Sequence, residues 1–325
     1  MSSPPIKVVL FGATGRIGRQ IVDGLLKSPT NFDITAVTRP ASLGKPENEE
    51  YRKKGVKVVG ALMTDPREKL AEILRGADAV ITPMFPAELD WQKNVIDVCK
   101  DVGVKRYIPS NFGPVMPPVG AMGMRDKKEE IVHYIKLRKV PYTIVDMAFW
   151  FELLRYRLPS GRTDYVLHPA ITDTRIAGDG NVRTAYAYYN SLGPAMARIL
   201  ADPRTINKYV HVYDDVFTQN QAVDALEEVS GEKVDRVYRP KEEIEAAISA
   251  IQAKVAQNPQ DEEAAIMLPM EQYTYSLDVI GDGTPELADY LGYLDVFKLY
   301  PDLKRRTVRD FYRDVLDGKH KGPFN

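Results

Sequence analysis

The first half of the chain alternates short apolar runs with segments in which apolar residues recur every three or four positions. The apolar runs lie at residues 6–11, 34–37, 56–59, 79–82, 106–109 and 142–145. Helical spacing marks segments between them, at residues 18–27, 70–74, 91–102 and 127–138. Continuous apolar strands that alternate with amphipathic helices are typical of a parallel sheet covered on both faces. The pattern therefore predicts an α/β fold with a doubly wound parallel sheet.

A glycine-rich turn, GATGRIG, follows the first predicted strand and opens the first predicted helix. Gly12 permits a tight turn, Gly15 lets backbone amides approach a pyrophosphate, and Gly18 allows close packing of helix and strand. The spacing differs from GxGxxG, so a turn without a ligand is the alternative, but its position after a strand favours dinucleotide binding. We therefore expect a Rossmann-type domain. Its predicted contacts in this turn are Gly12, Thr14, Gly15, Arg16, Ile17 and Gly18.

The second predicted strand is followed by Thr38 and Arg39, at the position where NAD-binding enzymes place an acidic residue. An arginine there can form charge-assisted, bidentate hydrogen bonds with the 2′-phosphate of NADP. Ser42 and Lys45 follow in the same loop and could complete the phosphate site. We therefore predict NADPH as the cofactor, with a solvated arginine as the alternative interpretation of Arg39.

After residue 150 the alternation of strands and helices becomes less regular. Glycine–aspartate turns occur at residues 178–180 and 281–283, and helical spacing occurs at residues 191–201, 218–230 and 241–256. We predict an NAD(P)-binding domain over residues 1–155 and a smaller substrate-binding region over residues 156–325. A strand near residues 209–212 is expected to return to the first sheet.

Composition narrows the possible chemistry. Lysine and arginine number 44 against 45 aspartates and glutamates, which predicts no nucleic-acid or anionic-membrane partner. One cysteine and 4 scattered histidines predict neither a disulfide framework nor a metal site, so an enzyme of this composition would depend on a cofactor. Neither a signal peptide nor a membrane-spanning run is apparent, so we expect a cytoplasmic monomer or homodimer that acts on a small molecule.

Ligands of open parallel sheets lie beyond the carboxyl ends of the strands, so the residues after the later strands should surround the nicotinamide. These predicted contacts are Pro83, Met84, Phe85, Ser110, Asn111 and Phe112. Phe85 and Phe112 could shield the ring from water or belong to the core. An irregular, methionine-containing segment at residues 114–124 could form an adaptable wall of an apolar pocket, or simply a loosely packed loop. The predicted substrate residues are Met122, Met124, Phe149, Trp150 and Phe151.

Lys127 and Lys128 begin the helix between the fifth and sixth predicted strands. Burial and the helix dipole can lower the pKa of such a lysine towards the range of a general acid or base, whereas cofactor phosphates oppose this effect. Taken alone, the residues favour solvated lysines at a helix start. The Tyr-x-x-x-Lys pair of ordinary short-chain dehydrogenases occurs only at residues 300–304, far past the sheet.

The chain resembles the isoflavone reductase-like, or phenylcoumaran benzylic ether reductase-like, branch of the NmrA-like atypical short-chain dehydrogenases, in a fungal form. The resemblance covers roughly residues 6–250. It rests on the glycine turn, Arg39, Gln92, VKRYIPSNFG at 104–113, VPYT at 140–143, GDGNV at 178–182 and DPRTINK at 202–208. It implies an NADPH-dependent reductase of phenolic, conjugated or polyketide-like secondary metabolites, with Gln92 among the residues of the cofactor site.

The resemblance also implies a catalytic residue. The family's catalytic lysine begins the helix that leads into the VPYT run, and the matching residue is Lys128, with Lys127 one position away. We therefore expect Lys128 to lie at the cofactor and to assist hydride transfer, by deprotonating a phenol or by stabilising oxyanion charge. The chain departs from the family at Asn111, where a glutamate is usual, and in the run after Thr143.

Two other functions stay open. NmrA-like proteins include dinucleotide sensors without catalysis, although such a sensor does not need Lys128. A redox-neutral isomerase or cyclase on the same fold is the other alternative, and Asn111 favours it mildly. The residues do not identify the substrate.

Overall fold

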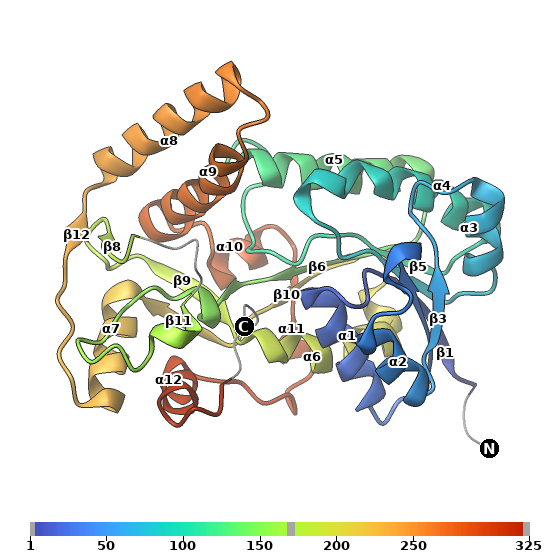
Figure 1. The fold of residues 1–325 in the computed structure, drawn as a ribbon, viewed down its shortest axis with the longest axis horizontal. Helices are drawn as coiled ribbons and strands as arrows, with labels where there is room; N and C mark the ends of the chain where they lie inside the picture. The colour runs from blue at the N-terminus through green and yellow to red at the C-terminus, as the bar shows by residue number, and fades with distance from the viewer. Residues whose placement is uncertain (1–3, 168–172, 321–325) are drawn as a thin grey trace.

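Five parallel strands form the first sheet, in the order β3-β2-β1-β4-β5. They are β1 (Ile6–Phe11), β2 (Phe32–Thr38), β3 (Lys57–Gly60), β4 (Ala79–Ile81) and β5 (Arg106–Ile108). In register, Leu10 of β1 faces Ala36 of β2 on one side and Ile81 of β4 on the other. This computed structural model, which describes residues 4–167 and 173–320, confirms the predicted α/β fold class (Figure 1).

A second parallel ladder continues from the β5 edge of this sheet. Tyr107 of β5 forms a single bridge with Tyr142, just before β6 (Thr143–Met147). β6 pairs with β10 (Lys208–Val212), which in turn pairs with β13 (Leu294–Asp295). The strand expected near residues 209–212 is therefore β10, next to β6. The division of the chain at residue 155 stays a prediction.

Helices cover both faces of the first sheet (Figure 1). They are α1 (Arg16–Leu26), α2 (Pro46–Lys53), α3 (Arg67–Leu74), α4 (Gln92–Val102), α5 (Gly123–Arg138) and α6 (Leu192–Ala201). Alternate residues of β1 point to opposite faces: Leu10 lies in one core with Ile21 of α1, and Val9 lies in another with Leu70 of α3. Burial on both faces explains why the predicted strands are continuously apolar.

The remaining elements surround the end of the second ladder. They include two small sheets, β11-β9-β7 and β12-β8, formed by β7 (Phe149–Trp150), β8 (Ile176–Ala177), β9 (Arg183–Ala187), β11 (Asp215–Thr218) and β12 (Tyr238–Arg239). The helices are α7 (Gln219–Ser230), α8 (Lys241–Gln257), α9 (Glu262–Tyr275), α10 (Pro285–Tyr290), α11 (Val296–Leu299) and α12 (Val308–Leu316). In residues 4–167 and 173–320, no helix combines the length and the apolar character needed to cross a membrane.

A close crossing of two helices joins the later part of the chain to the first sheet. α1 and α6 meet at Gly24 and Gly193, where a Cβ on Gly24 would lie 2.2 Å from the carbonyl carbon of Gly193. A Cβ on Gly193 would lie 2.4 Å from the backbone oxygen of Gln20. Both distances are far below van der Waals contact, so this approach of the two helices requires glycine at both positions.

Gly24→Ala is therefore expected to lower the free energy of unfolding by about 1–3 kcal/mol, because the added methyl group forces α1 and α6 apart. Urea titration measures this change. Gly44→Ala is the matched control, since a Cβ on Gly44 meets no atom within 4 Å. Equal stability of the two variants would contradict the observed crossing.

Candidate active site

The glycine-rich turn connects the carboxyl end of β1 to the start of α1. Gly12 adopts φ +63°, a conformation that favours glycine, and its carbonyl oxygen accepts a hydrogen bond of 2.9 Å from the amide of Gly15. A Cβ on Gly18 would lie 2.2 Å from the same carbonyl oxygen. Any larger residue at position 18 would therefore separate the helix from the turn. This compact turn leaves the N-terminus of α1 open to an anionic group.

A cavity of about 280 Å³ lies beside the turn. The predicted cofactor residues that line it are Gly12, Thr14, Gly15, Arg39, Lys45, Pro83, Met84 and Phe85, and Ser42 lines it as well. The side chains of Arg39 and Lys45 are exposed, and Arg39 forms no ion pair with any residue that the structure describes. Two exposed cations next to a glycine turn fit the phosphates of a bound NADP dinucleotide.

The prediction from sequence missed part of this cavity. Its lining also includes Ala61, Leu62 and Met63 after β3, and Glu88 and Trp91 in the turn of 3-10 helix at Pro86–Trp91. The residues after β3 could have been found, since β3 is a parallel strand of the same sheet and its carboxyl end lies at the same edge. Arg16, Ile17 and Gly18 do not line the cavity.

Gln92 holds together the ends of two strands. It is fully buried, and its side-chain oxygen accepts hydrogen bonds from the hydroxyl of Thr82 at 2.9 Å and from the amide of Ser110 at 3.0 Å. The hydroxyl of Ser110 in turn accepts a hydrogen bond from the amide of Met84 and donates one to its carbonyl oxygen. Gln92 therefore acts on the predicted cofactor site by positioning Met84 and Ser110.

Lys128 lies at the carboxyl end of β5, outside the cavity beside the glycine turn. Its amine is half-buried and donates a hydrogen bond to the backbone oxygen of Asn111, whereas Lys127 is exposed. Burial lowers the pKa of Lys128 to about 8, with Arg125 adding to the effect and Asp146 opposing it. An amine with this pKa can exchange a proton near neutral pH, as a general acid or base must.

Asn111 and Phe112 form a strained connection at this strand end. Phe112 adopts φ +29°, which is unusual for an aromatic residue, while its amide donates a 2.9 Å hydrogen bond to the backbone oxygen of Val145. The ring of Phe112 belongs to the core, but Phe85 is 77% exposed at the cavity. The side-chain amide nitrogen of Asn111 is buried and has no partner in the part of the chain that the structure describes.

A buried ionic network lies behind Lys128. Arg125 of α5 pairs with Asp146 of β6 at 2.7 Å and with Glu129 at 2.6 Å. The hydroxyl of Tyr293 donates a 2.5 Å hydrogen bond to the same oxygen of Asp146. These contacts fix the start of α5, which carries Lys128, against β6.

The predicted substrate residues differ in burial and in the residues that surround them. Phe151 is fully buried and packs against Phe311, with ring centroids 5.6 Å apart, so it lies in the core. Trp150 is half-buried beside Tyr189. Phe149, Met122 and Met124 belong to or border the same apolar cluster as Phe151.

Three comparisons relate this chain to known proteins. The model of the NmrA-like family matches residues 5–311. The chain is 37% identical over 316 residues to asnovolin J 5′,6′-dehydrogenase of Aspergillus novofumigatus, covering 97% of each protein. It is 28% identical over 324 residues to a phenylcoumaran benzylic ether reductase of Ginkgo biloba, covering 95% of this chain and 99% of that protein. The solved complex of Vitis vinifera leucoanthocyanidin reductase with NADPH has a TM-score of 0.77 at 23% identity, covering 96% and 99%.

Asp146→Asn is expected to lower the free energy of unfolding by about 3–5 kcal/mol, because it leaves Arg125 buried with too little compensating charge. Thermal or urea unfolding measures the loss. Asp90→Asn is the matched control, since Asp90 pairs with Lys93 at an exposed site where an ion pair contributes about 0–1 kcal/mol. Similar small losses in both variants would show that the buried network does not stabilise the fold.

Proposed function

Because the chain belongs to the NmrA-like family, as its sequence resemblance predicts, we propose that it is an NADPH-dependent oxidoreductase. Its substrate is a phenolic, conjugated or polyketide-like secondary metabolite. The observation that carries the proposal is the cavity that joins the glycine turn to Arg39 and Lys45. The names of the relatives in Aspergillus novofumigatus and Ginkgo biloba, a dehydrogenase and a reductase, support the same class of chemistry.

Different residues of the cavity would bind different parts of the cofactor. Arg39, Ser42 and Lys45 would hold the 2′-phosphate, and the turn from Gly12 to Gly15 would hold the pyrophosphate. Bound NADPH supplies the hydride. The protein binds and orients the reactants, and it supplies or accepts the accompanying proton.

Lys128 is the group that we assign to proton transfer. It is half-buried at the carboxyl end of β5, beside the strand ends that the cavity also uses. In its neutral form it can accept a phenolic proton, and in its charged form it can stabilise an oxyanion and then donate a proton. A sensor that only binds the cofactor has no use for a lysine in this state, so we favour the enzyme.

The reverse reaction, in which NADP⁺ oxidises a saturated substrate, also has support. The Aspergillus novofumigatus relative is named a dehydrogenase, which removes hydrogen from its substrate. Incubation with NADP⁺ and candidate saturated substrates, followed at 340 nm, tests this direction. Product formed without net change in NADPH would instead support the redox-neutral alternative that Asn111 favours.

Arg39→Asp should weaken NADPH binding about 10–100-fold, because it removes charge-assisted hydrogen bonds that contribute about 1.5–3 kcal/mol. NADH binding should change little, since NADH lacks the 2′-phosphate. Titrations followed by NADPH fluorescence and by NADH fluorescence measure the two affinities. Lys57→Asp, an exposed change at the start of β3 and hence at the opposite sheet edge, is the control. Unchanged NADPH affinity in Arg39→Asp would remove Arg39 from the site.

Lys128→Met should lower kcat about 10²–10⁴-fold and leave NADPH affinity nearly intact, because it removes the proton-transfer group without changing the glycine turn. Steady-state oxidation of NADPH against a panel of enones, quinones and benzylic ethers is the measurement. Lys127→Met distinguishes the two neighbouring lysines, and the exposed position of Lys127 predicts nearly normal turnover. Full activity of Lys128→Met would refute the assignment.

A further inference from the structure

A tyrosine from the later part of the chain lies next to Lys128. A Cβ built on Gly113 would lie 3.2 Å from the amine of Lys128 and 3.3 Å from the hydroxyl of Tyr273. Both polar groups therefore flank the same glycine at the carboxyl end of β5. A Cβ at position 113 would lie closer than ordinary van der Waals contact to both of them, so glycine permits both groups to approach the backbone here.

The polar side chains at this point are hydrogen-bond donors. The amine of Lys128 already donates a hydrogen bond to the backbone oxygen of Asn111. The buried side-chain amide nitrogen of Asn111 has no partner among the described residues. The carboxylate of Asp146, whose charge acts on Lys128, accepts hydrogen bonds from Arg125 and Tyr293. The arrangement therefore suits an oxygen that accepts hydrogen bonds.

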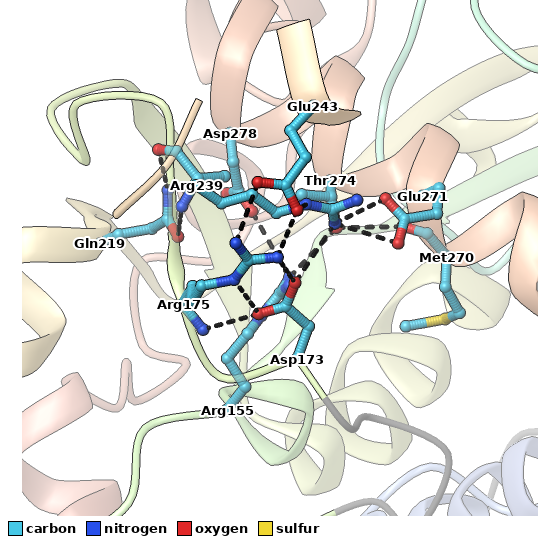
Figure 2. Close-up of polar contacts among 11 residues, drawn as sticks. Arg155, Asp173, Arg175, Gln219, Arg239, Glu243, Met270, Glu271, Thr274 and Asp278 are labelled. Atoms are coloured by element: carbon cyan, nitrogen blue, oxygen red, sulfur yellow. Dashed lines mark hydrogen bonds and ion pairs between the residues drawn. The ribbon is translucent and has the colours of Figure 1, made fainter. Parts of the chain in front are cut away.

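Polar contacts of Glu271 and Thr274, which flank Tyr273 in the sequence, anchor α9 (Figure 2). Glu271 accepts hydrogen bonds of 2.8 and 3.0 Å from Arg239, and the hydroxyl of Thr274 accepts one of 3.3 Å from Arg155. The ring of Tyr273 itself packs against Phe149, with ring centroids 5.9 Å apart. The hydroxyl is therefore presented by a fixed helix.

Tyr273 and Lys128 differ in protonation state, so each can take a different role. Burial raises the pKa of Tyr273 well above its usual range, so its hydroxyl stays protonated and acts as a donor at all working pH values. Lys128, with a pKa of about 8, can give up a proton and recover it from solvent.

Resting on the proposed function, we propose that Tyr273 is a catalytic residue that binds, together with Lys128, the carbonyl oxygen of an α,β-unsaturated ketone. Hydride from NADPH forms a C–H bond at the β-carbon. The C=C π pair then becomes a double bond between the α-carbon and the carbonyl carbon, and the C=O π pair moves onto the oxygen. Tyr273 donates a hydrogen bond to this enolate oxygen and Lys128 protonates it to the enol. Exchange with water adds a proton at the α-carbon and removes the hydroxyl proton, which yields the ketone. One enone, one NADPH and one proton thus give one saturated ketone and one NADP⁺.

The activity test uses chalcone, an aryl enone, with NADPH and the full chain. Tyr273→Phe should lower kcat about 10²-fold, the usual loss when one oxyanion donor is removed, while NADPH affinity stays unchanged. Tyr275→Phe is the matched control on the same helix, since the hydroxyl of Tyr275 donates to Glu245 at 2.7 Å. Normal chalcone turnover by Tyr273→Phe would overturn the proposal.

A second measurement follows the binding of chalcone and does not depend on turnover. Hydrogen bonds to the carbonyl oxygen of chalcone shift its long-wavelength absorption band to the red, so binding to the protein without NADPH should produce this shift. The shift should be smaller in Tyr273→Phe and normal in Tyr275→Phe. An equal shift in Tyr273→Phe and the unmodified protein would show that the hydroxyl does not reach the oxygen.

The pH dependence distinguishes an enone from a phenol. If Lys128 acts as an ammonium donor, kcat with chalcone should fall as pH rises through about 8, whereas a base that deprotonates phenols would give a rise. The charged and titratable groups around Lys128 are Arg125 and Glu129 of α5, Asp146 of β6, Tyr293 before β13 and Tyr273 of α9. Loss of the pH dependence in Lys128→Met assigns it to this amine, and a rise with pH would overturn the proposal.

The experimental outcome that would overturn this inference differs from the outcome that would overturn the proposed function. Oxidation of NADPH with a phenolic benzylic ether, with neither turnover nor a band shift for chalcone, would overturn the carbonyl assignment alone. Absence of NADPH binding to the unmodified protein would overturn the proposed function itself.

Discussion

The common direction of β1, β4, β5 and β6 is the constraint on which the site depends. Parallel strands carry their carboxyl ends to one edge of a sheet, so segments far apart in the sequence are brought together there. The glycine turn follows β1, Met84 follows β4, and Asn111 follows β5. Hydrogen bonds that the side chains of Gln92 and Ser110 accept then fix the segments after β4 and β5 relative to one another. Without that shared edge, the glycine turn and Lys128 would be unrelated features of the chain.

Strands and the cofactor turn could be predicted from the sequence because their signals are local. Continuous apolar runs mark strands that are buried on both faces, and Gly12 and Gly18 are needed by backbone geometry within a few residues. Lys128 could be singled out only through the family resemblance, since its neighbours include Asp146 of β6 and Tyr273 of α9, which are distant in the sequence. Tyr273 could not be found at all, because no local pattern in α9 indicates which of its residues faces Gly113. Trp91 was missed for a similar reason, whereas Leu62 could have been found because it follows a parallel strand of the same sheet.

The strand end at Asn111 and Phe112 combines backbone strain with an unpaired polar group. A residue held at φ +29° costs of order 1–3 kcal/mol, and the surrounding contacts must over-determine it. Here the hydrogen bond to Val145 and the buried ring of Phe112 do so. The result is a rigid segment that keeps the backbone oxygen of Asn111 beside Lys128. A neutral amide at position 111 also leaves the site without the carboxylate that the family resemblance would suggest.

The anchoring of α9 makes this helix largely independent of the first sheet. The contacts of Glu271 and Thr274 are made with Arg239 and Arg155, so the helix is held from outside the parallel sheet. Because these contacts lie outside the first sheet, substitutions at exposed positions of α9 are expected to leave the strands and the glycine turn unchanged. The helix and the nucleotide turn can in this way vary independently of one another.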